Sequence, residues 1–148
     1  SAASDVYKRQ AVPPWEIDKP LFSQPDPDRT VKMFRRIIAH THHLVVLSLL
    51  KAKLQTAHLS LRLKLLGMTQ PTDIADALGV TNNYQFKAAT QLGDRLGVAL
   101  TKRMLDEVLE VEAQVKGGSR IDGNVLVEMT LLRMCLLVKH HMEHTGWR

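Results

Sequence analysis

Residues 125–138 read VLVEMTLLRMCLLV, and eleven of these fourteen residues are apolar. The exceptions, Glu128, Thr130 and Arg133, do not alternate with apolar residues as they would in a half-buried strand, so the stretch predicts a helix. Asp122 precedes it as a candidate N-cap. A helix this apolar must be covered nearly all round, either by its own bundle or by another chain.

The chain upstream of this helix shows the same helical pattern, divided by glycines. In residues 101–116, apolar side chains recur at spacings of four and three, which predicts a helix with one packed face. No sustained alternation of the strand type follows Pro27. We therefore expect an all-α fold, a helical bundle of five or six helices. Predicted helices over 71–78, 83–96 and 101–116 end at Gly79, Gly97 and Gly117.

The stretch between Pro27 and Gly67 contains no glycine or proline. A single helix of this length would be unusual in a compact domain. We expect a first helix capped by Asp28, a break near 54–58, and a second helix that ends near Leu66.

The first 28 residues hold five of the six prolines and show no helical period. Such a composition is typical of a linker or an N-terminal arm. Residues 1–10 also resemble translated adaptor sequence that is not native, so the prediction of the fold leaves them out. The sequence thus predicts an arm over 1–28 and a helical domain over 29–148.

The basic excess of the chain, a formal net charge of +5, is concentrated in one segment. Residues 29–70 hold eight lysines and arginines and no aspartate or glutamate. Two interpretations stay open: a surface for phosphate or an acidic partner, or a solvated face whose long side chains cover apolar surface. The candidate basic surface consists of Arg35, Arg36, Lys51, Lys53, Arg62 and Lys64.

The chemistry-bearing residues do not form a recognisable catalytic or cofactor site. His40 with His43, and His140 with His144, have helical spacings but no convincing third ligand for a metal. Cys135 lies in the most apolar helix and is expected to be a buried thiol. No phosphate-binding glycine loop occurs in the sequence. We therefore expect no catalytic residue, no metal and no cofactor.

The number of cysteines and the lengths of the apolar runs indicate the cellular compartment of the chain. A single cysteine excludes an internal disulfide and suits a reducing compartment. No uninterrupted apolar run approaches the ~20 residues that a membrane span needs. We expect a cytoplasmic chain with no membrane partner.

Residues 71–80, PTDIADALGV, followed by a turn and a further helix, have the form of a helix-turn-helix. The second helix offers Asn83, Gln85, Lys87, Gln91 and Arg95 to a DNA groove, but also Asp94. A helix-turn-helix DNA-binding module is therefore one candidate function.

Several segments in order resemble the C-terminal region of the delta subunit of the bacterial DNA polymerase III clamp loader. That region has a basic first helix, an Ile-Ala-x-x-Leu-Gly-Val turn, an acidic-x-x-x-Lys-Gly segment and a leucine-rich last helix. The corresponding segments here are 34–38, 74–80, 112–117 and 128–135.

The resemblance implies a helical collar domain that joins the other clamp-loader subunits and supports loading of the sliding clamp in DNA replication. It also implies a non-catalytic fragment: the parent complex is a DNA-directed DNA polymerase, with ATP bound in neighbouring subunits. Contact with DNA would be indirect or weak, and contact with the sliding clamp would need a domain absent from this chain. On this reading the candidate subunit interface lies on the last helix and comprises Leu131, Leu132, Met134, Leu136 and Leu137.

Overall fold

The structure is a computed structural model that describes residues 10–146. Within this range the chain is all-α and contains no strand, which confirms the predicted fold class. Its elements are η1 (Pro14–Ile17), η2 (Lys19–Ser23), α2 (Pro27–Ile38), α3 (His43–Leu65), α4 (Pro71–Leu78), α5 (Asn83–Lys116) and α6 (Gly123–Thr145).

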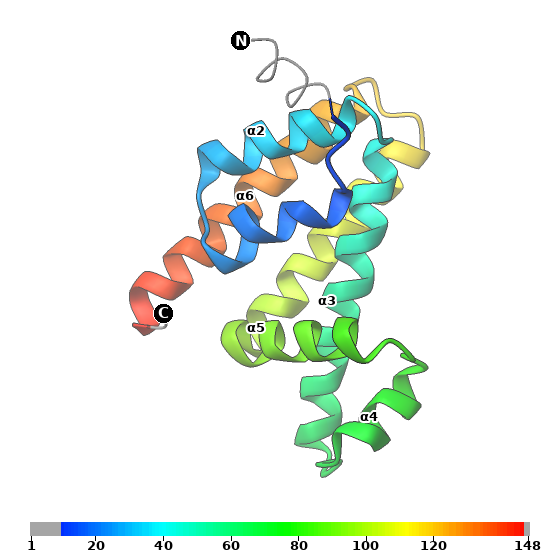
Figure 1. Ribbon diagram of the computed structural model, residues 1–148, viewed down its shortest axis with the longest axis vertical. Helices are drawn as coiled ribbons and strands as arrows, with labels where there is room; N and C mark the ends of the chain where they lie inside the picture. The colour runs from blue at the N-terminus through cyan, green and yellow to red at the C-terminus, as the bar shows by residue number, and fades with distance from the viewer. Residues whose placement is uncertain (1–9, 147–148) are drawn as a thin grey trace.

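The helices form two packed pairs. Helix α3 packs along α5, and α2 lies beside α6 (Figure 1). The short helices η1 and η2 lie against α2, and η2 also contacts α6. Helix α4 packs at the C-terminal end of α3, so α3 extends from the main core to the α4 end of the molecule.

Glycine controls the packing of α5 on α3. Gly97, with φ of 82° and ψ of 170°, interrupts the helical backbone of α5, so its two halves run in different directions (Figure 1). A positive φ is open to glycine at little cost. Gly93 lies against α3 so closely that a Cβ atom there would be 2.7 Å from the carbonyl oxygen of Ala57. The predicted end of a helix at Gly97 is therefore present as this kink.

The break between the first two helices is not where the sequence predicted it. Helix α2 ends at Ile38 and α3 begins at His43, whereas the chain is continuous helix through residues 54–58. The imidazole Nδ1 of His42 accepts a hydrogen bond from the Leu44 amide at 3.1 Å and caps α3, a role that needs neither glycine nor proline. Leu54 and Ala57 are buried, and Ala57 lies directly against α5.

The start of the first long helix also differs by two residues from the prediction. Oδ1 of Asp26, rather than of Asp28, accepts from the Arg29 amide at 3.1 Å and is the N-cap. Asp122 caps α6 as predicted, by accepting from the Asn124 amide at 2.7 Å. Gly79 ends α4 in the left-handed conformation, also as predicted.

The proline-rich segment predicted as an arm is part of the domain. Ile17, Leu21 and Phe22 are at most 2% exposed and belong to the same core cluster as α2, α3 and α6. Prolines obscured this in the sequence because they suppress the α-helical period, yet they are compatible with the first turns of η1 and η2. The packed domain therefore includes residues well before Arg29.

Candidate protein interface

The outer face of α6 carries a stripe of apolar side chains, defined here as the α6 stripe: Val125, Met129, Leu132 and Leu136. Their spacing of four, three and four places them on one side of the helix. Val125, Met129 and Leu136 are 47–50% exposed, and Leu132 is half-buried. The opposite side of the helix faces the core, so the α6 stripe is apolar surface that the fold leaves uncovered.

The five predicted interface residues divide into two groups. Leu131 and Met134 are at most 1% exposed and lie in the core cluster, so their prediction as interface residues is wrong. An apolar run alone does not say which side of a helix the bundle covers. Leu132 and Leu137 are half-buried and Leu136 is half-exposed, so these three remain accessible.

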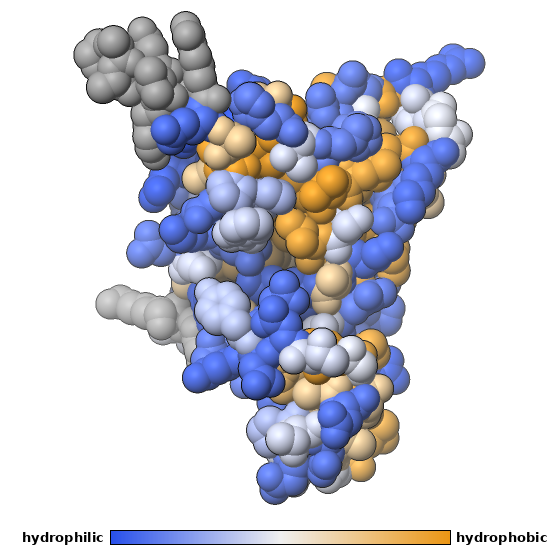
Figure 2. Space-filling model, turned by 45° about the vertical axis from the view of Figure 1, so that its right-hand side comes forward, coloured by the Kyte–Doolittle hydropathy of each residue, from blue (hydrophilic) through white to orange (hydrophobic). Residues whose placement is uncertain are grey.

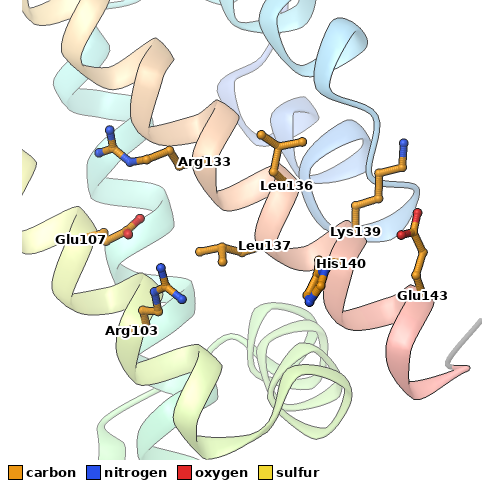
Figure 3. Close-up of a pocket in the computed structure, with 8 residues that line it drawn as sticks. All are labelled: Arg103, Glu107, Arg133, Leu136, Leu137, Lys139, His140 and Glu143. Atoms are coloured by element: carbon orange, nitrogen blue, oxygen red, sulfur yellow. The ribbon is translucent and has the colours of Figure 1, made fainter.

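A cleft of about 560 Å³ lies between α5 and α6, next to the C-terminal half of the α6 stripe. Leu137 points from α6 toward α5, into the space beside Glu107 and Arg103 (Figure 3). Arg133 extends from α6 over the same region. The cleft therefore combines an apolar wall with charged groups. It is lined by Arg103, Glu107, Arg133, Leu136, Leu137, Lys139, His140 and Glu143.

One carboxylate oxygen in this cleft has no hydrogen-bond partner among the described residues. Oε2 of Glu107 is buried and accepts no hydrogen bond. A buried acceptor without a donor costs about 1–3 kcal/mol relative to a satisfied one. Glu107 is not among the predicted site residues, because an acid four positions after Arg103 on a helix is typical of an exposed ion pair. Val125 and Met129 are not among the five predicted interface residues, although their helical spacing with Leu132 is visible in the sequence.

The candidate basic surface is largely neutralised by acids from other elements. Lys51 of α3 lies 3.0 Å from the carboxylate of Glu112 on α5. This hydrogen bond is the main cause that lowers the pKa of Glu112 below its ordinary value. Arg35 of α2 makes two hydrogen bonds to Glu128 of α6, at 2.8 and 3.2 Å.

Two further lysines of α3 are paired in the same way. Lys53 binds the carboxylate of Asp18, next to η1, and its ammonium lies over the ring of Phe22 at 5.7 Å. Lys64 lies 3.2 Å from Asp94 of α5.

Of the two remaining members of the candidate basic surface, Arg36 is half-buried and also has an interaction partner. Arg62 is exposed, and no acid of residues 10–146 forms an ion pair with it. The interpretation as a face compensated by the fold is therefore better supported than a free phosphate-binding surface.

The segment predicted as a helix-turn-helix has the expected succession of elements. After α4 and Gly79, Asn82 caps α5 by accepting from the Gln85 amide at 3.0 Å. Tyr84, Gln85 and Lys87 are exposed on the first turns of α5. Two acids on α4 and one on α5 are exposed in the same segment, so its surface is of mixed charge: Asp73, Asp76 and Asp94.

The histidines do not cluster with other ligand types. The rings of His140 and His144 are 3.9 Å apart, and those of His42 and His43 are 4.0 Å apart. Across residues 10–146, no three side chains of the types His, Cys, Asp and Glu are placed to hold a metal ion together.

One helix, α3, is long and apolar enough to cross a membrane by length and composition alone. It also carries Lys51, Lys53 and Lys64, each paired with a carboxylate, and packs along α5.

Comparisons with protein-family models, with curated proteins and with solved structures find no match to this chain.

Proposed function

We propose that this chain is an assembly domain that binds other subunits of a bacterial clamp loader, in the manner of the collar domain of the delta subunit. The observation that carries the proposal is the α6 stripe with the adjoining α5–α6 cleft. Three side chains of this stripe are about half-exposed on one face of a helix whose other face is core. An exposed apolar face with a polar rim is typical of a surface that a partner covers.

The cleft supplies the features of a binding hot spot. Leu136 and Leu137 offer apolar contact, and the rim of the cleft carries the carboxylates of Glu107 and Glu143. A partner side chain with an apolar stem and a hydrogen-bond donor at its end would fill the cleft and pair with a carboxylate at its edge. We expect a lysine, arginine or tyrosine side chain of the partner in this position.

On this proposal the domain is not catalytic and acts in the cytoplasm. ATP would be bound by neighbouring subunits and nucleotidyl transfer would be carried out by the polymerase of the parent complex. Contact of this domain with DNA would be indirect or weak, because five of the eight bases of residues 29–70 are ion-paired. Contact with the sliding clamp would belong to a different domain.

The test is co-purification of the chain with co-expressed clamp-loader subunits. The variant Leu136→Glu places a charge in the α6 stripe and should weaken subunit binding at least about tenfold, which corresponds to about 1.4 kcal/mol. Leu109→Glu is the matched control, since Leu109 is 40% exposed on α5 and does not line the cleft. The proposal fails if the wild-type chain binds no clamp-loader subunit, or if both variants bind as well as wild type.

A second candidate function is duplex DNA binding through α4 and the first half of α5. The exposed amide, amine and phenol groups of Gln85, Lys87 and Tyr84 favour it. A DNA reader would lose affinity steeply between 50 and 200 mM salt, on the order of 10³-fold or more for a protein with several phosphate contacts. Tight, salt-sensitive binding that Lys87→Ala weakens would place this function ahead of the assembly proposal.

A further inference from the structure

The end of the molecule that holds α4 has buried apolar residues outside the main core. Ile74 of α4, with Phe86 and Ala89 of α5, is buried, but none of the three belongs to the main core cluster. We name residues 67–89, which comprise α4 and the first turns of α5, the α4 lobe. It lies at the narrow lower end of the molecule in Figure 2. A part of a fold that contributes little to the main core can open while the rest stays folded.

His58 of α3 lies where the main core ends. It follows by one turn Leu54, the last residue of α3 in the main core cluster, and it is 4% exposed. Its Nδ1 lies 3.1 Å from the hydroxyl oxygen of Thr101. That oxygen is 2.8 and 3.1 Å from the carbonyl oxygens of Gly97 and Val98. One hydroxyl group therefore connects the buried imidazole to the backbone at the kink of α5.

The kink at Gly97 separates the α4 lobe from the second half of α5. Because the helical backbone is interrupted there, the two halves are not one rigid rod, and a small change of φ and ψ can turn one against the other. The first half covers α3 at Ala57, through the close approach of Gly93. Ala57 directly precedes His58, so turning the first half of α5 away from α3 admits water to the imidazole.

A proton on His58 places a charge in this covered position. Burial is the largest cause that lowers the pKa of His58 below its ordinary 6.5, and the charges of Arg62 and Lys102 lower it further. The backbone of Val98, by a hydrogen bond, and the charge of Asp106 act in the opposite direction. When the lobe is open and His58 is in water, burial no longer disfavours the proton. As pH falls below 6.5, the open form therefore binds the proton more readily and the closed form loses population.

We propose that His58 is a pH-sensitive switch: neutral His58 keeps the α4 lobe closed against α3, and protonated His58 lets the lobe open about Gly97. Histidine is the residue whose charge ordinarily changes between pH 5 and 8. His58 is the only histidine in residues 44–139, so the lobe contains no other group of this kind. The switch does not depend on the subunit-binding proposal.

A second histidine contacts the backbone beside the kink and provides a matched control. Nε2 of His141, on α6, lies 2.9 Å from the carbonyl oxygen of Arg95. Since a carbonyl oxygen only accepts, Nε2 carries the proton of this hydrogen bond. A further proton at Nδ1 leaves the hydrogen bond in place, so His141 does not act as the switch.

Hydrogen exchange of the intact chain at pH 7.5 and 5.5 tests the proposal, after correction for the intrinsic pH dependence of exchange. Amides of residues 71–89 should be less protected than those of α6 at both pH values, because they exchange by local opening. Their protection should fall about three- to tenfold at pH 5.5, tenfold being the limit for a group that titrates at 6.5 only in the open form. Protection equal to that of α6, or a lobe whose protection does not change with pH, overturns the switch.

The variants assign the response to one side chain. His58→Gln retains a group that can hydrogen-bond to Thr101 but takes up no proton, so protection of its lobe should be the same at both pH values. His141→Gln should keep the wild-type response. A His58→Gln lobe that responds like wild type overturns the proposal.

Two exposed substitutions decide the matter if His58→Gln does not fold. Arg62→Gln removes a charge that lowers the pKa of His58 and should make the pH response of the lobe smaller. Asp106→Asn removes a charge that raises this pKa and should make the response larger. Equal responses of the two variants, or the opposite order, overturn the proposal.

Discussion

The thiol of Cys135, on α6, contacts one residue of η2 and one residue of α2. Its thiol donates to the carbonyl oxygen of Pro20 at 3.4 Å, and the hydroxyl of Thr30 lies 3.6 Å from its sulfur. Burial is the main cause that raises the pKa of this thiol above its ordinary value. We expect thiol reagents to modify the folded chain only at the rate at which the domain opens, and the urea-unfolded chain at once. Rapid stoichiometric modification under native conditions would contradict the burial.

His58 should make the stability of the domain depend on pH. Its Nδ1 lies 3.1 Å from the hydroxyl oxygen of Thr101, which is also 2.8 Å from the carbonyl oxygen of Gly97. Burial is the main cause that lowers the pKa of His58 below its ordinary 6.5. Below pH 6.5 the unfolded chain therefore binds this proton more readily than the folded chain, and the free energy of unfolding falls as pH decreases.

The measurement is urea unfolding between pH 7.5 and 5, compared with His58→Gln. The variant lacks the buried imidazole, so its stability should fall less steeply over this interval, even if it is lower at pH 7.5. Equal slopes for the two proteins would show that His58 does not contribute.

At the scale of elements, Gly93 sets the distance between α3 and α5. A methyl group there would be 2.7 Å from the Ala57 carbonyl oxygen, which belongs to the backbone of α3 and cannot rotate away. We expect Gly93→Ala to lower the free energy of unfolding by about 1–3 kcal/mol through overpacking. The control Gln91→Ala, at an exposed position of the same helix, should change it by less than about 0.5 kcal/mol in thermal or urea unfolding.

Helix ends that are marked by a glycine or by a capping aspartate could be predicted from the sequence. Helix ends that depend on contacts with distant parts of the chain could not. Gly79, Gly97 and Asp122 act through their own backbone or side chain, so the elements they bound were correctly placed. The break at residues 39–42 depends instead on the His42 cap and on the packing of α3 against Gly93. That packing joins residues far apart in the chain, and no local pattern expresses it.

At the scale of the whole molecule, the proline-rich start of the chain is part of the core. Phe22 is 2% exposed, whereas Trp15, seven residues earlier, is 63% exposed. We expect Phe22→Ala to lower the free energy of unfolding by about 3–5 kcal/mol and Trp15→Ala to have little effect. A small effect of Phe22→Ala in urea unfolding would mean that this segment is an arm after all.

The candidate site was only partly predictable, for a reason that also concerns the whole molecule. The apolar pattern of residues 125–138 correctly predicted a helix, and Leu136 is half-exposed on it. Which side of α6 faces outward depends on where α2 and α5 pack, so Leu131 and Met134 were misplaced. Likewise the charge of the basic segment is offset by Glu112 and Glu128, whose proximity only the fold creates.

The long-range ion pairs have a consequence for the unfolded chain. The four carboxylates that pair with Arg35, Lys51, Lys53 and Lys64 are 30 to 93 residues away in sequence. In the denatured ensemble the eight bases of residues 29–70 therefore have no acid within their own segment and repel one another. Fluorescence energy transfer between dyes at residues 29 and 70 in urea should report an expanded segment that contracts as added salt screens this repulsion.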